Sequence, residues 1–209
     1  MSLLEITIKG GLIMIPIILS GALTLAIIIE KLITLKRAEI DTEKFLGQLE
    51  AILRRRKIKE ALEFCNRYSQ PIPRIIKEGI LKSDRSREEI KEAIEDAASY
   101  EIPQLEKYLG ILATIATVAP LLGLLGTVTG LIKGFMVIEA KGGLVNPSDL
   151  ARGIWEALIT TVGGLTVAIP AYLSYNYFVS KVNNLILQME KSATRIMDIF
   201  FLLKSEEEQ

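Results

Sequence analysis

Three stretches of this 209-residue chain carry no charged residue over a length that could cross a lipid bilayer. They run from Gly10 to Ile29, from Tyr108 to Ile132 and from Ala157 to Ser180. A membrane-spanning helix takes about 20 mostly apolar residues. The first stretch is followed by EKLITLKRAE, with no small-residue cleavage site, so we expect it to be retained rather than removed as a signal peptide. The sequence therefore predicts an all-α membrane protein with three transmembrane helices.

Lysine and arginine are unevenly placed along the chain. They crowd the segment between the first two stretches and recur after residue 180, whereas only Lys9 precedes the first stretch. Because cytoplasmic loops carry an excess of these residues, we expect the N-terminus outside and long helical extensions in the cytoplasm. The run RRRK at 54–57 indicates a topology signal or a contact with acidic membrane lipid. The expected segments are 1–36 (periplasmic N-terminus and first transmembrane helix), 37–107 (cytoplasmic helical loop), 108–136 (second transmembrane helix), 137–152 (short periplasmic loop), 153–180 (third transmembrane helix) and 181–209 (cytoplasmic helical tail).

Local signals predict the helices of the cytoplasmic loop. Asp41 or Thr42 can cap a first helix, and Ser86 with Glu89 fits a capping box that opens a later one. That later helix is expected to continue into the second stretch, with a bend at Pro103. The two prolines of SQPIP, residues 69–73, predict a turn.

The tail carries apolar residues at alternating steps of four and three, which is the spacing of a heptad seam. One interpretation is an amphipathic helix that packs on the loop helices of its own chain. The other is that the third span continues into the cytoplasm and packs against neighbouring subunits. The sequence leaves both open. The seam consists of Val182, Ile186, Met189, Ala193, Ile196, Phe200 and Leu203.

Small residues follow one face of the second and of the third stretch. Helices in lipid associate by close approach of their backbones, so these faces can simply pack against other helices. They can also line a narrow passage or leave room for the helix of another protein. The faces consist of Ala113, Ala116, Pro120, Gly123, Thr127, Gly130 and Gly134 in the second stretch, and of Ala157, Thr161, Gly164, Ala168, Ala171 and Tyr175 in the third.

Glu156 stands at the outer boundary of the third stretch, where an acid is by default a functional candidate and often a proton site. The alternative is an ordinary ion pair with Arg152, four residues earlier. Thr160 follows one turn later on the same face, so a polar track can continue inward from the acid. No second carboxylate, histidine or lysine lies in the second and third stretches, so a complete proton relay would need a group from a partner.

The composition argues against most enzymes. The chain has no histidine and a single cysteine, Cys65, which removes the commonest general base and any cysteine metal cluster. It also lacks nucleotide-binding, nucleophile-elbow and zinc-protease motifs. Its 25 basic and 25 acidic residues balance, unlike the basic surface of a nucleic-acid binder. The sequence thus predicts no enzyme, no cofactor or metal site, and no nucleic-acid partner.

Two longer motifs resemble a known family. APLLGLLGTVTGLIKGF at 119–135 and GIWEALITTVGGLTVAIPAYLSYNYF at 153–178 are similar to the ExbB/TolQ/MotA proton-channel family. The three-span plan resembles ExbB and TolQ rather than the four-span MotA, and the opening GGLIMIPIILSGALTLAIIIEKL is closer to ExbB. One departure is Thr129, where many members carry tryptophan.

The resemblance implies a subunit of a bacterial inner-membrane motor. It implies a pentamer around a dimer of a single-span ExbD-like or TolR-like partner, whose membrane aspartate lies in the pore. Proton flow would then energise outer-membrane transport through a TonB-like protein. The other roles left open are a TolQ-like envelope-integrity motor, a motility motor and a passive membrane scaffold.

The same resemblance implies particular site residues. Thr127 and Thr161 match the pore-facing threonines of the family and Glu156 matches its acid, while Thr160 joins them in the expected proton pathway. Contact with the partner helices is expected at Ala116, Pro120, Gly123, Gly130, Gly164, Ala168 and Ala171.

Overall fold

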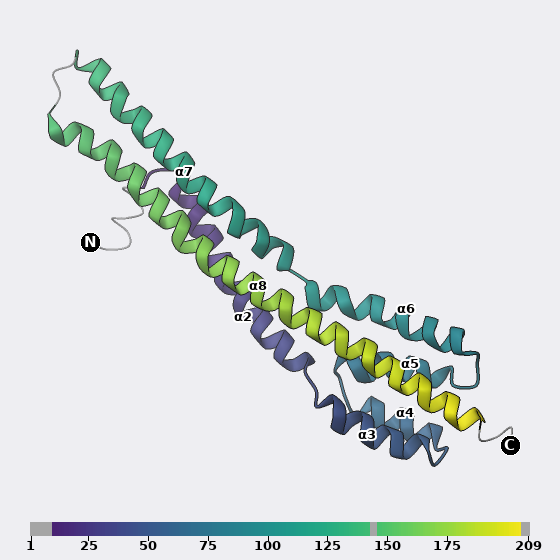
Figure 1. Cartoon of the computed structure of the whole chain (residues 1–209). Coiled ribbons are helices and arrows are strands. Elements are labelled where there is room, and N and C mark those ends of the chain that lie inside the picture. Colours follow the sequence, from purple (N-terminus) through teal and green to yellow (C-terminus); the bar gives the residue numbers. More distant parts are fainter. Residues whose placement is uncertain (1–9, 143–145, 206–209) are drawn as a thin grey trace. The chain divides into compact units, whose positions relative to one another are not determined.

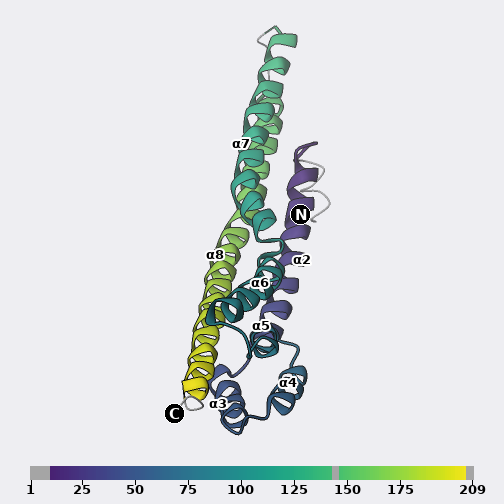
Figure 2. The same cartoon turned by 90° about the vertical axis from the view of Figure 1, so that its right-hand side faces the viewer.

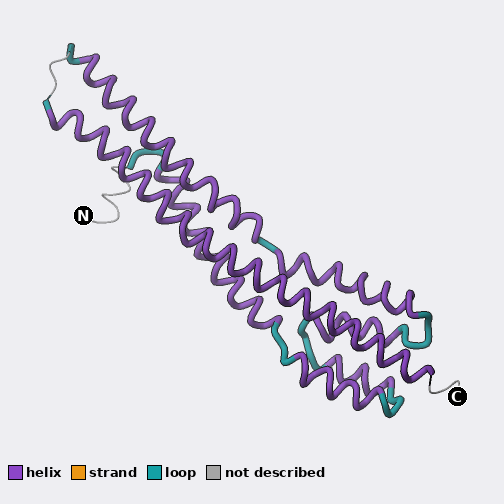
Figure 3. The backbone as a smooth tube through the Cα atoms, viewed as in Figure 1, coloured by secondary structure: helices purple, strands orange, loops and turns teal. Residues whose placement is uncertain are grey.

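The computed structural model of the chain describes residues 10–142 and 146–205, and every regular element within them is a helix (Figure 1, Figure 3). Three helical segments are long and apolar enough to cross a membrane. They lie within Met14–Leu53, Arg87–Ala140 and Ala151–Leu203, each of which overlaps one of the three charge-free stretches. An all-helical chain with three membrane-length helices is therefore confirmed. Residues 1–9, for which we expect a periplasmic location, and residues 143–145 and 206–209 fall outside this description.

The helices form two compact units. Unit 1 holds Met1–Glu30 and Tyr108–Phe178, and unit 2 holds Lys31–Lys107 and Val179–Gln209. The helix bounds are α2 (Met14–Ala38), α3 (Thr42–Leu53), α4 (Ile58–Asn66), α5 (Pro71–Leu81), α6 (Arg87–Glu106), α7 (Leu109–Ala140) and α8 (Pro147–Ser205). Helices α2 and α8 therefore contribute residues to both units.

Unit 2 is a helical bundle in which consecutive helices from α3 to α6 pack on one another (Figure 2). An aromatic cluster lies at its α3–α4 end, where the rings of Phe45 and Phe64 stack with centroids 5.4 Å apart. Tyr68 meets Phe45 edge-on at 5.2 Å. Cys65 is buried in α4, and burial raises the pKa of its thiol to about 12. A thiol that stays protonated at neutral pH is unreactive, so Cys65 serves packing.

The predicted heptad seam lies on the part of α8 that belongs to unit 2. Val182, Met189 and Ile196 on this seam are all at least 98% buried. Met189 also lines a cavity of about 460 Å³ together with Ile75 of α5 and Ile94 of α6. These contacts support the interpretation that the seam packs on the loop helices of its own chain. Contact with neighbouring subunits stays a prediction.

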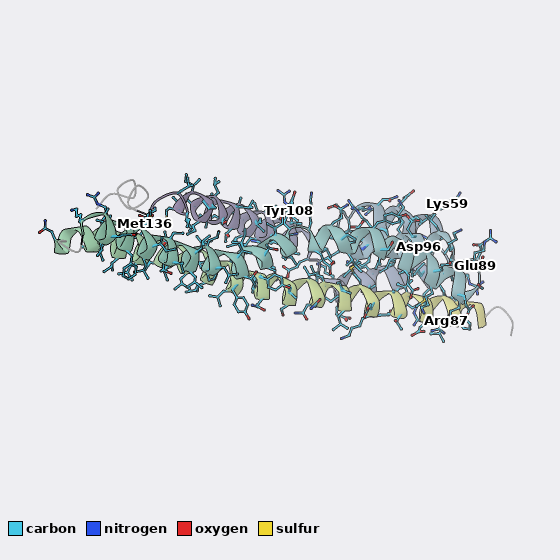
Figure 4. The ribbon with its side chains drawn as sticks, turned by 90° about the horizontal axis from the view of Figure 1, so that it is seen from above. Lys59, Arg87, Glu89, Asp96, Tyr108 and Met136 are labelled. Carbon is cyan, nitrogen blue, oxygen red and sulfur yellow. The ribbon has the colours of Figure 1, made fainter. Side chains whose placement is uncertain are left out.

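The start of α3 and the start of α6 follow the predicted capping chemistry. Asp41 is the N-cap of α3, and its carboxylate accepts a hydrogen bond from the backbone N–H of Lys44 at 3.1 Å. Ser86 accepts from the backbone N–H of Glu89, and the Glu89 carboxylate accepts from the N–H of Ser86, which completes a capping box. Figure 4 labels Arg87 and Glu89 in this first turn of α6.

The prolines of SQPIP lie slightly beyond the turn that they predict. The bend ends at Gln70, and Pro71 and Pro73 stand in the first turn of α5. The first amides of a helix have no partner within the helix, so proline can occupy these positions without losing a hydrogen bond. The two residues are buried and open the helix that follows the turn.

The expectation of one continuous helix from Ser86 into the second stretch is wrong. Helix α6 ends at Glu106, and α7 begins at Leu109 after Tyr108, whose φ of 67° is left-handed (Figure 4). This conformation ends a helix, whereas Pro103 lies within α6. An interrupted helix leaves its last carbonyls without amide donors.

Lys31 supplies the missing donor at the end of α6. Its side chain is fully buried, and its ammonium donates to the carbonyl oxygens of Leu105 at 3.0 Å and Gln104 at 3.5 Å. A lysine near a helix C-terminus also interacts favourably with the helix dipole. A residue 74 positions away from Leu105 in sequence thus stabilises the end of α6.

Candidate functional site

Helices α7 and α8 run side by side in unit 1, and glycines bring their backbones close together (Figure 1, Figure 2). A Cβ atom placed on Gly130 would lie 2.8 Å from the carbonyl oxygen of Gly153, and one on Gly164 would lie 2.5 Å from that of Ala119. A Cβ on Gly123 would lie 3.0 Å from the Thr160 carbonyl oxygen. Only glycine permits this approach, which is how membrane helices associate.

These contacts show that part of the small-residue faces packs against a neighbouring helix of the same chain. Gly123, Gly130 and Gly164 are buried against the neighbouring helix of the same chain. Of the other residues at which a partner helix is expected, Ala168 and Ala171 are buried and Ala116 and Pro120 are half-buried. Contact with a partner stays a prediction for all seven of these residues.

Thr160 fills the closest part of the α7–α8 contact. Its side chain is fully buried and occupies the space where a Cβ on Gly126 would be. Its hydroxyl donates to the carbonyl oxygens of its own helix, Ala157 at 2.9 Å and Glu156 at 3.1 Å. Gly126 was not identified from sequence, because it falls outside the face with alternating steps of three and four.

The two threonines expected to face a pore are both half-buried. The hydroxyl of Thr161 donates across the helix contact to the carbonyl oxygen of Gly123 at 3.3 Å. The hydroxyl of Thr127 donates back to Leu124 of its own helix at 2.6 Å. Threonine commonly satisfies its hydroxyl on its own helix, whereas a bond to the next helix also fixes the register of the two helices.

Glu156 forms an ion pair with Lys133 of α7. The Glu156 side chain is 16% exposed and that of Lys133 is 57% exposed. Arg152, the partner that the local spacing suggests, is exposed on α8 and is not the residue that the carboxylate contacts. Sequence reasoning missed Lys133 because it lies 23 positions from Glu156 and on another helix. Its one signal is that it is the first charge after the second stretch.

The backbone before α2 covers the same carboxylate. Gly11 has a φ of 67°, and a Cβ placed on it would overlap the Oε1 atom of Glu156. Lys133 Nζ would lie 3.6 Å from that Cβ position. The acid is therefore held between the Lys133 ammonium and the Gly11 backbone. Among the residues described, no three acidic or cysteine side chains gather in a way that could hold a metal ion.

Unit 1 is thus part of an α-helical membrane protein in which two glycine-packed helices carry threonines and an acid–lysine pair. Residues 67–191 match the MotA/TolQ/ExbB proton channel family. The chain belongs to this family.

Two relatives agree with this assignment, and one solved structure shares the fold. A Methanothermobacter thermautotrophicus protein named as an ExbB homologue is 33% identical over 190 residues, which cover 90% of this chain and 67% of that one. The Tol-Pal system protein TolQ of Haemophilus influenzae is 44% identical over 88 residues, covering 42% of this chain and 38% of TolQ. The fold is similar to C. jejuni MotAB, with a TM-score of 0.61, 19% identity, and coverage of 91% of this chain and 78% of that one.

Proposed function

We propose that the chain is the channel subunit of an inner-membrane motor that uses the proton motive force. In this proposal it works with an ExbD-like single-span partner and energises outer-membrane transport through a TonB-like protein. Membership of a proton channel family supports the general role. Similarity to the ExbB homologue over 90% of the chain favours the transport role.

The topology is part of the proposal. The N-terminus lies outside, the three apolar helices cross the membrane, and residues 37–107 and 181–209 extend into the cytoplasm. The excess of lysine and arginine between the first two spans supports this orientation. The short connection near residues 137–152 then lies outside, with Glu156 at the outer end of the third span.

The observation that carries the proposal is the polar row along the α7–α8 contact. This row consists of Thr127, Thr160, Thr161 and Glu156, in which the Thr161 hydroxyl bridges the two helices and the Thr127 hydroxyl donates within α7. An ionisable side chain at membrane depth, here Glu156, is by default a candidate for a pathway. The chain offers no second acid within these spans, so the proposed partner supplies the titrating carboxylate from a dimer inside a pentamer.

Proton flux into liposomes tests this function. The chain is reconstituted with its single-span partner, and wild type is compared with Thr161→Val. We expect flux in wild type and loss of at least about tenfold in the variant, with the complex still assembled, because the hydroxyl is lost but the volume is kept. Thr166→Val is the matched control, since Thr166 lies on the same helix, is exposed and donates to its own helix at Val162.

The outcomes of this test separate a pathway from a packing role. Equal flux in wild type and Thr161→Val would move the pathway away from this threonine. Loss of assembly in Thr161→Val alone would give Thr161 a packing role. Absence of flux in wild type would support a passive scaffold, which the glycine packing of α7 on α8 also fits.

A TolQ-like role is the second candidate. TolQ is 44% identical over 88 residues, and an ExbB of Aquifex aeolicus is 45% identical over 87 residues, so identity over a segment of this length supports the two roles equally. The single-span protein that co-purifies with the chain discriminates between the two roles. If that protein is TolR-like, the proposed role becomes envelope integrity instead of outer-membrane transport.

A further inference from the structure

The ion pair between Lys133 and Glu156 assigns a role to two residues that lie on different helices. We propose that Glu156 is the counter-ion of Lys133 at the outer end of the polar row, rather than the group that carries the proton. This inference rests on the proposed function and assigns a task to each charge within it. Lys133 is a positioning residue that fixes the carboxylate, and Glu156 cancels the lysine charge.

The enclosure of the carboxylate is the first argument. The Glu156 side chain is 16% exposed, so its charge is largely removed from water and needs a partner of opposite charge. Lys133 provides that partner, and the Gly11 backbone covers the carboxylate closely enough that a Cβ there would overlap it. A carboxylate held on two sides is poorly placed to exchange protons with a neighbour.

The direction of the neighbouring hydroxyl is the second argument. Thr160 follows Glu156 by one helical turn and is the nearest candidate for passing a proton inward. Its hydroxyl donates to the backbone carbonyls of Ala157 and Glu156 rather than to the Glu156 carboxylate. The hydroxyl of Thr161 likewise donates to a carbonyl, that of Gly123. Neither hydroxyl therefore donates to the Glu156 carboxylate.

Electrostatics gives Glu156 its function without any proton transfer. A lone ammonium at the entrance of a cation pathway raises the barrier for protons, because like charges repel. Glu156 cancels that charge while it is paired. The charged residues described near this end of unit 1 also include Glu139, Lys141 and Arg152, all of them exposed.

A double-mutant cycle tests the inference in liposomes that contain the chain and its single-span partner. We expect Glu156→Gln to lower proton flux by about tenfold or more, because it leaves the Lys133 charge uncancelled. Lys133→Met combined with Glu156→Gln should return flux to within about threefold of wild type, because no charge then remains. The charge-swapped double variant, Lys133→Glu with Glu156→Lys, keeps the ion pair with its charges exchanged. It should therefore also restore flux.

Arg152→Met in the Glu156→Gln background is the matched control. It removes a nearby positive charge that the carboxylate does not contact, so flux should stay low. Size-exclusion chromatography and thermal melting of each complex check that a low flux does not reflect misfolding, and the double variant should melt closer to wild type than either single variant does.

Three outcomes would overturn the inference. If the neutral double variant is as slow as Glu156→Gln while wild type conducts, Glu156 is needed for itself, and the inference fails while the proposed function stands. If Arg152→Met restores flux as well as Lys133→Met does, the effect is one of general charge and not of this pair. If wild type shows no flux, the proposed function fails and the inference fails with it.

Discussion

Gly11 shows how a single residue can set the environment of the acid. Its φ of 67° lies in the left-handed region, and a Cβ placed on it would overlap the Glu156 Oε1 atom, so a side chain there would have to displace the carboxylate. Two separate effects therefore oppose any other residue at this position. One is backbone strain of about 1–2 kcal/mol, and the other is displacement of the carboxylate from Lys133.

Gly11→Ala is expected to destabilise the protein by about 2–4 kcal/mol, because strain and the disturbed ion pair add. The free energy of unfolding in detergent measures this. Gly142→Ala is the matched control, since Gly142 has a φ of 57° but open space around its α-carbon, and it should lose only about 1–2 kcal/mol. Equal losses in the two variants would show that the contact with Glu156 contributes nothing.

At the scale of helices, charged side chains join α3 to the tail segment of α8 in unit 2. Arg195 of α8 donates to Glu43 at 2.9 Å and to Glu50 at 3.2 Å, and Arg54 donates to Glu50 at 2.9 Å. The hydrogen bond from Arg54, followed by that from Arg195, lowers the pKa of Glu50. Glu43 and then Glu50 raise the pKa of Arg195.

The lowered pKa of Glu50 makes this contact sensitive to acid. A carboxyl with a depressed folded-state pKa contributes stability above its unfolded pKa, of about 4.3, and that stability is lost as pH falls through the folded value. Glu50→Gln should remove this contribution to the pH dependence of the free energy of unfolding. At neutral pH the variant should lose less than about 1 kcal/mol of that free energy, because the partners Arg54 and Arg195 are exposed.

Unfolding free energies of the wild type and of Glu50→Gln between neutral pH and pH 3 measure this contribution. Arg54→Met should reduce the acid dependence more than Arg195→Met does, because the Arg54 hydrogen bond is the largest cause of the lowered pKa. An unchanged pH dependence in Glu50→Gln would exclude Glu50 as a contributor. The reverse order of the two arginine variants would show that α8 dominates over the local pair.

Elements that depend on neighbouring residues were predictable, whereas those that depend on distant residues were not. The capping box of Ser86 and Glu89 and the seam of α8 follow from spacing along one helix, and both are found. The break between α6 and α7 at Tyr108 was missed. The carbonyls left without amide donors at the end of α6 accept from Lys31, and no local sequence pattern indicates a donor from so far along the chain.

The candidate site divides in the same way. The sequence identified Glu156 as an exceptional acid, but the spacing rule for a single helix offered Arg152 as its partner instead of Lys133. Gly126 was missed beside Thr160, because only the register of α7 against α8 brings the two together. Residue types and faces were therefore predictable, and contacts between helices were not.

At the scale of the whole molecule, unit 2 leaves apolar side chains uncovered on α8. Leu187 is 46% exposed and Leu202 is 56% exposed. Leu187 and Leu202 line a groove of about 540 Å³ together with Glu50, Arg54 and Arg195. In the proposed topology this groove faces water, and its lining combines two exposed leucines with charged side chains, as protein interfaces do. We propose that a second copy of the chain covers it, in keeping with the pentamer that the family resemblance implies.

Leu187→Glu tests this interface in the intact protein. A carboxylate here loses the apolar contact and must give up its water on burial, even beside the basic side chains of the groove, so the assembly should dissociate toward the 23.2 kDa monomer. The fold of each copy should persist, because the side chain is exposed within its own chain. Native mass spectrometry in detergent counts the copies.

Leu81→Glu is the matched control, since Leu81 is 50% exposed on α5 and lies outside the groove. If Leu187→Glu assembles like wild type, the subunits meet through another face. If both variants dissociate, the effect comes from added charge and not from the groove.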